Sequence, residues 1–102
     1  MEKKVKVIWA FSALEMLAEI HEYISEKSEQ AADNYVEGIY DSTKKLEQYP
    51  ESYAPCRNQK LKESGYRCCL YKNHIIVYKF ANNEVEILAI IHSRRNPVDI
   101  EV

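Results

Sequence analysis

Glycine, proline and long apolar runs are scarce in this sequence, and each scarcity excludes a class of protein. Two Gly and three Pro among 102 residues, with 46% apolar and 29% charged residues, exclude a linker or a disordered tail. No run approaches the roughly 20 apolar residues of a membrane helix, and the start, Met-Glu-Lys-Lys-Val-Lys-Val, lacks the apolar core of a signal peptide. We therefore expect one soluble, cytoplasmic domain over residues 1–102.

Cysteine and histidine are too few and too irregularly spaced for a framework of disulfides or metal ligands. The three cysteines are odd in number, and Cys68 and Cys69 are adjacent in a predicted strand, where neighbouring side chains point to opposite faces. The histidines, His21, His74 and His92, stand in none of the paired Cys/His spacings of a zinc site. The sequence predicts no disulfide framework, no metal and no cofactor.

The charge is small overall but unevenly placed along the chain. Residues 1–50 carry 6 Lys/Arg against 10 Asp/Glu, and residues 51–102 carry 8 against 6, for a net charge of −2. Phosphate contacts dominate affinity for nucleic acid, and this balance supplies few of them. Binding to nucleic acid is therefore allowed but not indicated.

The first half of the chain predicts one strand and two helices. Residues 4–9 alternate as a strand buried on one side. Ser12 and Glu15 fit a capping box, which predicts a helix beginning at Ala13. Residues spaced 3, 4, 7 and 10 apart form the apolar stripe of this helix, namely Leu14, Leu17, Ala18, His21 and Ile24.

A second helix is predicted from about Glu29, because apolar residues keep the same period up to Pro50, which ends it. The two helices form an αα-hairpin. Residues 50–65 have weak periodicity and predict a loop, with a short strand near Leu61 as an option.

Three β-rich runs follow, and they predict an antiparallel meander. The runs cover residues 66–71, 75–80 and 85–92, and the pairs Lys72-Asn73 and Asn82-Asn83 separate them. Asn tolerates a positive φ better than most residues, so both pairs suit two-residue hairpin turns. The predicted fold class is α+β, with an N-terminal strand, an αα-hairpin and a three-stranded meander.

The last predicted strand is apolar on both faces. Strict alternation puts Leu88 and Ile90 on one face and the remaining apolar residues on the other, namely Val85, Ile87, Ala89 and Ile91. Such a strand belongs in the middle of a sheet that is covered on each side. The helical hairpin covers one face, and either a partner protein or the 50–65 loop covers the other.

The candidate functional groups are basic and lie at the ends of the predicted meander. Arg67 opens its first strand, and Arg94 and Arg95 follow its last. The guanidinium group offers bidentate donors to phosphate, although a solvated charge beside a strand is the plainer interpretation. His92 could act as an acid or base, or simply donate a structural hydrogen bond. In an up-down-up meander Arg67 and Arg95 start from opposite ends, so whether they converge stays open.

The order of these elements resembles the RelE/ParE toxin superfamily of type II toxin-antitoxin systems. The resemblance covers nearly the whole chain and rests on V-x-V-I-W at the start, L-E-Q-Y-P after the second helix, Y-R before the meander, I-I-V-Y in its second strand and V-E-I-L-A-I-I-H-S-R-R in its third. It implies a small α+β toxin that arrests growth and stabilises plasmids. It also implies an antitoxin partner, in a hetero-oligomer, that wraps the toxin and partly covers its sheet.

The superfamily divides into two mechanisms, and the resemblance implies different residues for each. RelE-like members cleave mRNA on the ribosome, and for this activity Arg67 and Arg95 match the arginines before and after the meander, with His92 as an acid or base. ParE-like members poison DNA gyrase and need no catalysis. Lys60 or Lys62 match the loop lysines of RelE-like members only loosely. Whichever the mechanism, the residues expected to bind a target or partner are Arg94, Arg95, Lys60, Lys62, Leu88 and Ile90.

The long first helix, the tight hairpin and the H-S-R-R ending resemble the ParE-like branch, and two departures from RelE-like members favour it as well. RelE-like members commonly end with a Tyr, or with a His and a Tyr, that does acid-base work or stacks on the base, and residues 96–102 supply neither. Members of that branch are also strongly basic, whereas this chain is not. A ParE-like gyrase inhibitor is therefore the first hypothesis. A RelE-like mRNA interferase is the alternative, and an inactive antitoxin-binding homologue is the third.

Overall fold

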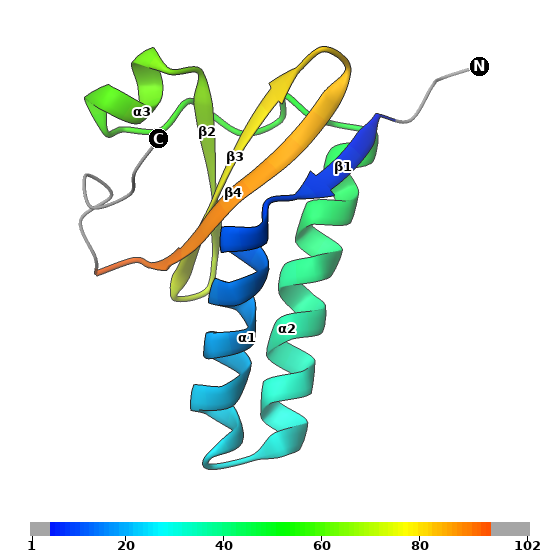
Figure 1. Ribbon diagram of the computed structural model, residues 1–102, viewed down its shortest axis with the longest axis vertical. Helices are drawn as coiled ribbons and strands as arrows, with labels where there is room; N and C mark the ends of the chain where they lie inside the picture. The colour runs from blue at the N-terminus through cyan, green and yellow to red at the C-terminus, as the bar shows by residue number, and fades with distance from the viewer. Residues whose placement is uncertain (1–4, 95–102) are drawn as a thin grey trace.

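The chain folds into a four-stranded sheet with a helical hairpin packed against one face (Figure 1). The computed structural model describes residues 5–94. Its elements are β1 (Lys6–Trp9), α1 (Phe11–Ser25), α2 (Glu29–Lys44), the 3₁₀ turn η1 (Lys45–Glu47), α3 (Gln59–Glu63), β2 (Tyr66–Tyr71), β3 (His74–Ala81) and β4 (Glu84–His92). The α+β class predicted from the sequence is confirmed.

The sheet has the strand order β1-β4-β3-β2. β1 runs parallel to β4, whereas β4 with β3 and β3 with β2 are antiparallel. β4 thus lies between two strands, as expected for a strand with apolar residues on both faces.

The two hairpin turns of the meander contain two residues each. Tyr71 pairs with His74, and Ala81 pairs with Glu84. In the second turn both Asn82 and Asn83 adopt positive φ angles, 53° and 60°. In the first turn the positive φ, 49°, belongs to Lys72 and not to the asparagine that follows it.

A β-bulge at Leu88 changes the faces of β4. Val77 pairs with Ala89 but Tyr78 pairs with Ile87, which leaves Leu88 as an extra residue. Val85 and Ile87 therefore face the helical hairpin together with Ile90, while Ala89 and Ile91 face the opposite side. The face assignment expected from strict alternation is wrong beyond Leu88, because one extra residue reverses every side chain after it.

Side chains near the beginning of α1 form hydrogen bonds with backbone groups of β4 that lie beyond its pairing with β1. Ser12 Oγ donates to the Leu88 carbonyl oxygen at 3.0 Å, and the Ile90 N–H donates to Met16 Sδ at 3.4 Å. The predicted capping box is wrong, since α1 begins two residues earlier at Phe11 and Ala10 precedes it without a side-chain cap. The Ser12 hydroxyl serves the bulge instead.

The helices bury small and branched residues against the sheet. In α1 Ala13 is fully buried, and Met16, Leu17 and Ile20 pack beside it. Leu14, expected in the apolar stripe, is 47% exposed, because the stripe is turned by one position from the prediction. α2 begins at Glu29 as expected, with the Ser28 side chain accepting from the Ala31 N–H.

The 50–65 loop covers the other face of the sheet. It contains the short helix α3 where a strand near Leu61 was an option, and the Asn58 side chain caps this helix through the Leu61 N–H. Leu61 packs into a second cluster of buried residues, which also contains Cys56, Tyr66, Val77, Ala89 and Ile91. Of the two covers considered for this face, the described residues show the loop.

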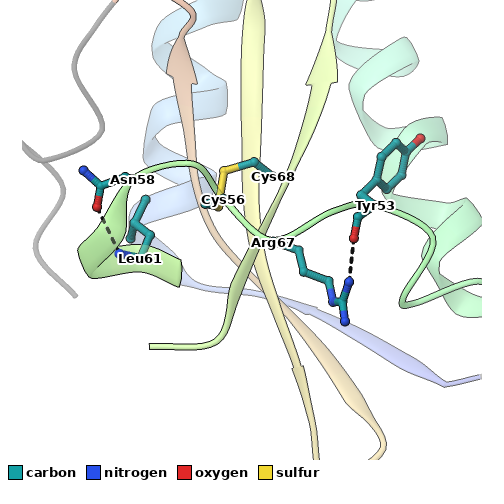
Figure 2. The surroundings of a disulfide bond; sticks show 6 residues. All are labelled: Tyr53, Cys56, Asn58, Leu61, Arg67 and Cys68. Carbon is teal, nitrogen blue, oxygen red and sulfur yellow. Dashed lines mark hydrogen bonds between the residues drawn. A yellow bond between two sulfur atoms is a disulfide. The ribbon is translucent and has the colours of Figure 1, made fainter. Parts of the chain in front are cut away.

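Cys56 and Cys68 form a disulfide, which corrects the expectation of no disulfide framework (Figure 2). Pro55 forms an isolated antiparallel β-bridge with Arg67. This short pairing brings the Cα atoms of Cys56 and Cys68 to 4.9 Å from each other. The sequence pattern predicts an unpaired loop for residues 50–65, and such a loop gives no indication of this pairing. Cys69 remains a buried free thiol on the other face, as the alternation of a strand requires.

Candidate functional site

Arg67 is held by the 50–65 loop. Its Nη1 donates to the Tyr53 carbonyl oxygen at 2.6 Å, as Figure 2 shows, and its Nη2 lies 3.6 Å from Glu51 Oε2. The side chain is 25% exposed. The guanidinium therefore holds the Tyr53 carbonyl and pairs with Glu51. This is a structural role, which differs both from a solvated charge beside a strand and from a phosphate contact.

The structure separates Arg67 from the end of β4. Arg67 pairs with Tyr78 near one end of β2, whereas His92 pairs with His74, which in turn pairs with Tyr71 at the other end. The two places are four residue steps apart along β2, which is about 13 Å of strand. Arg94 is exposed just after β4, and Arg95 lies outside the described residues.

Histidine and tyrosine side chains gather at the end of β4, in what we name the strand-end cluster: Tyr35, Tyr71, Lys72, His74 and His92. The rings of His74 and His92 pack edge to face at 5.2 Å between centroids, and Tyr35 packs similarly on His74. The Lys72 ammonium lies 5.7 Å from the Tyr35 ring centroid and 5.5 Å from that of Tyr71. Residues from β2, β3, β4 and α2 thus meet here.

Hydrogen bonds hold both imidazoles in place. Tyr35 Oη lies 2.7 Å from His74 Nδ1 and accepts from the Asn73 N–H at 3.4 Å. His92 Nδ1 accepts from the Arg94 N–H at 3.2 Å. One nitrogen of each ring is therefore engaged within the protein, and no hydrogen bond of the described residues engages either Nε2.

Burial lowers the pKa of His74 below its usual 6.5, and a positive charge on nearby His92 lowers it further. Burial also raises the pKa of the Tyr35 hydroxyl. Both groups are therefore neutral at pH 7, and they suit hydrogen-bonded recognition better than charge stabilisation.

A groove of about 520 Å³ opens beside the strand-end cluster. One wall is α1, which contributes apolar side chains and Glu19, and the other wall carries His74 and His92. Tyr23, at the rim, is 76% exposed. A groove with an apolar wall is the kind of surface that receives the apolar face of an amphipathic helix.

The other predicted binding residues lie on separate surfaces. Lys60 and Lys62 are exposed on α3, across the sheet from the helical hairpin. Leu88 is half-buried at the bulge, and Ile90 is only 3% exposed, with its backbone N–H bonded to Met16 of α1. Ile90 therefore lies beneath the groove as core.

The described residues give no indication of a metal site or of a membrane-spanning helix. Within residues 5–94, no group of three or more His, Cys, Asp or Glu is arranged to hold a metal ion. In the same part of the chain, no helix is long and apolar enough to cross a membrane.

Sequence reasoning missed Tyr35 and gave His74 no role. A regular hairpin around Asn82-Asn83 would pair His74 with Ile91, and only the bulge moves the pairing to His92. Tyr35 reaches His74 from a different element, and the sequence carries no signal for that contact. The nearest indication of a role for His74 in the sequence is the turn Lys72-Asn73 that directly precedes it.

Comparison with known proteins agrees with the fold. In P. aeruginosa, a chain of the chromosomal ParDE toxin-antitoxin system is 19% identical, with a TM-score of 0.73, and the alignment covers 87% of this chain and 96% of that one. A chain of the RelBE2 toxin-antitoxin complex from Mycobacterium tuberculosis is 14% identical, with a TM-score of 0.63 and coverage of 90% and 94%. No curated protein sequence matches significantly.

The strand, helical hairpin and meander thus define a RelE/ParE-like fold. The family model for the ParE toxin of the parDE type II toxin-antitoxin system matches residues 7–97. The chain belongs to this ParE toxin family, as the resemblance in the sequence predicted.

Proposed function

We propose that this ParE family member arrests growth by binding DNA gyrase and that a cognate antitoxin neutralises it. The observation that carries the proposal is the family match over residues 7–97. The proposal includes a cytoplasmic location, a toxin-antitoxin hetero-oligomer and, for a plasmid-borne copy, plasmid stabilisation. Under this hypothesis the protein is not an enzyme.

The positions of the basic groups support binding over RNA cleavage. Cleavage of RNA needs cationic groups gathered around one phosphate. Here Arg67 is engaged by Tyr53 and Glu51, far along the sheet from His92. Glu19 also lines the groove next to both histidines, and its carboxylate repels a phosphate.

Purified gyrase tests the proposal directly. The toxin is expected to inhibit supercoiling of relaxed plasmid, and prior addition of antitoxin is expected to prevent the inhibition. We propose that Arg94 and Arg95, and separately Lys60 and Lys62, contact the target, so charge reversal at each pair should weaken inhibition. Lys27→Glu, on an exposed turn, is the matched control. Normal supercoiling at saturating toxin would exclude gyrase as the target.

The alternative is a RelE-like mRNA interferase, with the histidine pair as the feature in its favour. His74 and His92 pack at 5.2 Å between ring centroids, which places two imidazoles at one site, and imidazole is the side chain that most often acts as a general acid or base. Primer extension on translated mRNA should then reveal cuts that vanish with Arg67→Ala, Arg95→Ala or His92→Ala. Absence of cuts on programmed ribosomes would exclude the mRNA interferase alternative. Harmless expression with intact antitoxin binding would instead identify an inactive homologue.

We propose the groove beside the strand-end cluster as one contact surface for the antitoxin. Tyr23 lines the groove and is exposed without a partner chain, and tyrosine is enriched among the residues that dominate binding energy once an interface buries them. Tyr23→Ala is expected to weaken antitoxin binding at least about five-fold, which corresponds to about 1 kcal/mol. Tyr49→Ala, 62% exposed and outside the groove, is the control. Calorimetry with the product of the adjacent short reading frame measures both.

A further inference from the structure

The Cys56–Cys68 disulfide fastens the 50–65 loop to the edge of the sheet (Figure 2). Backbone hydrogen bonds flank it, from the Cys56 N–H to the Tyr66 oxygen at 3.1 Å and from the Cys68 N–H to the Ala54 oxygen at 3.3 Å. The loop covers the second cluster of buried residues. The disulfide therefore holds in place the loop that covers one of the two clusters of buried residues.

A second groove, of about 660 Å³, opens onto the disulfide. Both Cys56 and Cys68 line it, together with apolar side chains from β2 and β3. Cys56 is 1% exposed, whereas Cys68 is half-buried. An incoming thiolate therefore meets Cys68 Sγ first, and Cys56 is the leaving sulfur.

The charge on the groove selects the kind of thiol. Arg57 is exposed and lines the groove beside both cysteines. A guanidinium attracts carboxylates and also stabilises a departing thiolate. Small thiols that carry carboxylates, of the glutathione class, match this combination.

We propose that Cys56–Cys68 is a reversible thiol-disulfide exchange site for small anionic thiols and that reduction releases the 50–65 loop. This inference is independent of the proposed function. A disulfide in a reducing compartment is usually catalytic or redox-sensing, whereas an oxidising compartment keeps it closed.

The exchange balances in two steps. One small thiolate attacks Cys68 Sγ, the Cys56–Cys68 bond breaks, and Cys56 leaves as a thiolate. A second small thiolate attacks the small-molecule sulfur of the mixed disulfide, and Cys68 leaves as a thiolate. Two small thiols are thereby oxidised to one small disulfide while the protein disulfide takes up two electrons, and water supplies protons to the cysteines.

Cys69 does not take part in this exchange. It is adjacent to Cys68 but points to the opposite face, where it is 2% exposed in the first core. Burial raises the pKa of its thiol, which keeps it protonated and unreactive. The exchange is therefore confined to two cysteines and has two end states.

Reduction should loosen the loop more than the rest of the fold. The crosslink spans 12 positions in sequence, and a closed loop of similar length contributes enough stability to shift the Tm of a small domain by about 10 °C or more. The α1–α2 hairpin packs on the opposite face and makes no covalent tie to the loop among the described residues.

The test equilibrates the full chain in glutathione buffers, followed by alkylation, mass spectrometry and hydrogen exchange. Expected results are one two-electron transition, alkylation of Cys56 and Cys68 but not of Cys69, and at least ten-fold faster amide exchange in residues 54–65 of the reduced protein. Exchange in α1 and α2 should change less than three-fold. Failure to form the disulfide with oxidised glutathione, or equal acceleration everywhere, overturns the proposal. The double variant Cys56→Ser, Cys68→Ser, which keeps Cys69, should reproduce the reduced state without any added thiol.

Arg57→Ala tests the preference for anionic thiols. The ratio of the reduction rate by glutathione to that by neutral mercaptoethanol is expected to fall by up to about five-fold, the range of an exposed ion pair. Lys62→Ala removes an exposed charge from α3 that does not line the groove, and it should leave the ratio unchanged. An unchanged ratio in Arg57→Ala, or an equal fall in both variants, refutes selection by Arg57.

Discussion

Replacing Gly38 with alanine tests how α2 and β2 hold the strand-end cluster together. A Cβ atom at Gly38 would overlap the Tyr71 hydroxyl and come within 2.5 Å of Tyr71 Cζ. The glycine thus makes room for the aromatic ring. Alanine at this position requires the ring to leave its place between α2 and the turn.

The magnitude follows from two opposing terms. In an exposed helix interior, Gly→Ala stabilises by about 1 kcal/mol. Here the Tyr71 ring would give up its edge contact with Tyr35, at 5.3 Å between centroids, which is worth about 0.5–1.5 kcal/mol. It would also lose burial and the Lys72 contact, together about 1.5–2.5 kcal/mol. We expect Gly38→Ala to lower the free energy of unfolding by about 1–3 kcal/mol.

Urea unfolding followed by far-UV circular dichroism measures this change in a double-mutant cycle. In a Tyr71→Ala background the obstacle is gone, so Gly38→Ala should stabilise that variant by about 1 kcal/mol. Stabilisation of the wild-type background by the same amount would refute the steric role of Gly38. The sign of the effect, more than its size, decides the outcome.

Three further predictions concern individual contacts. Because the pKa of His74 is lowered in the fold, the unfolded chain binds more protons below about pH 6.5, so the free energy of unfolding should fall from pH 7 to pH 5, and His74→Gln should reduce this fall in urea titrations. Ser12→Ala leaves the Leu88 carbonyl without its side-chain donor and should cost about 1 kcal/mol in the same assay, whereas an unchanged midpoint contradicts a role for Ser12 at the bulge. Arg67→Ala should accelerate amide exchange in residues 50–56 but not in α2, since its guanidinium holds the Tyr53 carbonyl, and unchanged exchange there would contradict this role.

Local patterns predicted the elements well where one period dominates. The strands, the start of α2 and the two-residue turns followed from alternation, helical spacing and turn residues. The start of α1 did not, because the Ser12 hydroxyl had two possible partners. It could accept from the local Glu15 N–H or donate to a distant carbonyl, and the sequence suggests only the local partner. In the structure the Ser12 hydroxyl donates to the Leu88 carbonyl oxygen at the bulge, which lies within reach only once β4 is folded.

The candidate site was less predictable because one extra residue decides it. Without the bulge at Leu88, His74 would face Ile91, and the histidine pair would not form. The disulfide depends similarly on Pro55 lying beside Arg67, a pairing between a loop and a strand that has no periodic signal. Such contacts come from tertiary packing, so the sequence identified His92 but not its partners.

The position of β1 beside β4 also sets the order in which the molecule can be made. Lys6 pairs with Glu84 and Trp9 with Ile87, so β1 pairs with a strand that is synthesised long after it. The helical hairpin can form early from local contacts, but the middle of the sheet must await β4. During synthesis β1 therefore remains an unpaired apolar edge, open to other proteins until β4 arrives. A chain truncated before residue 84 should be unable to build this sheet.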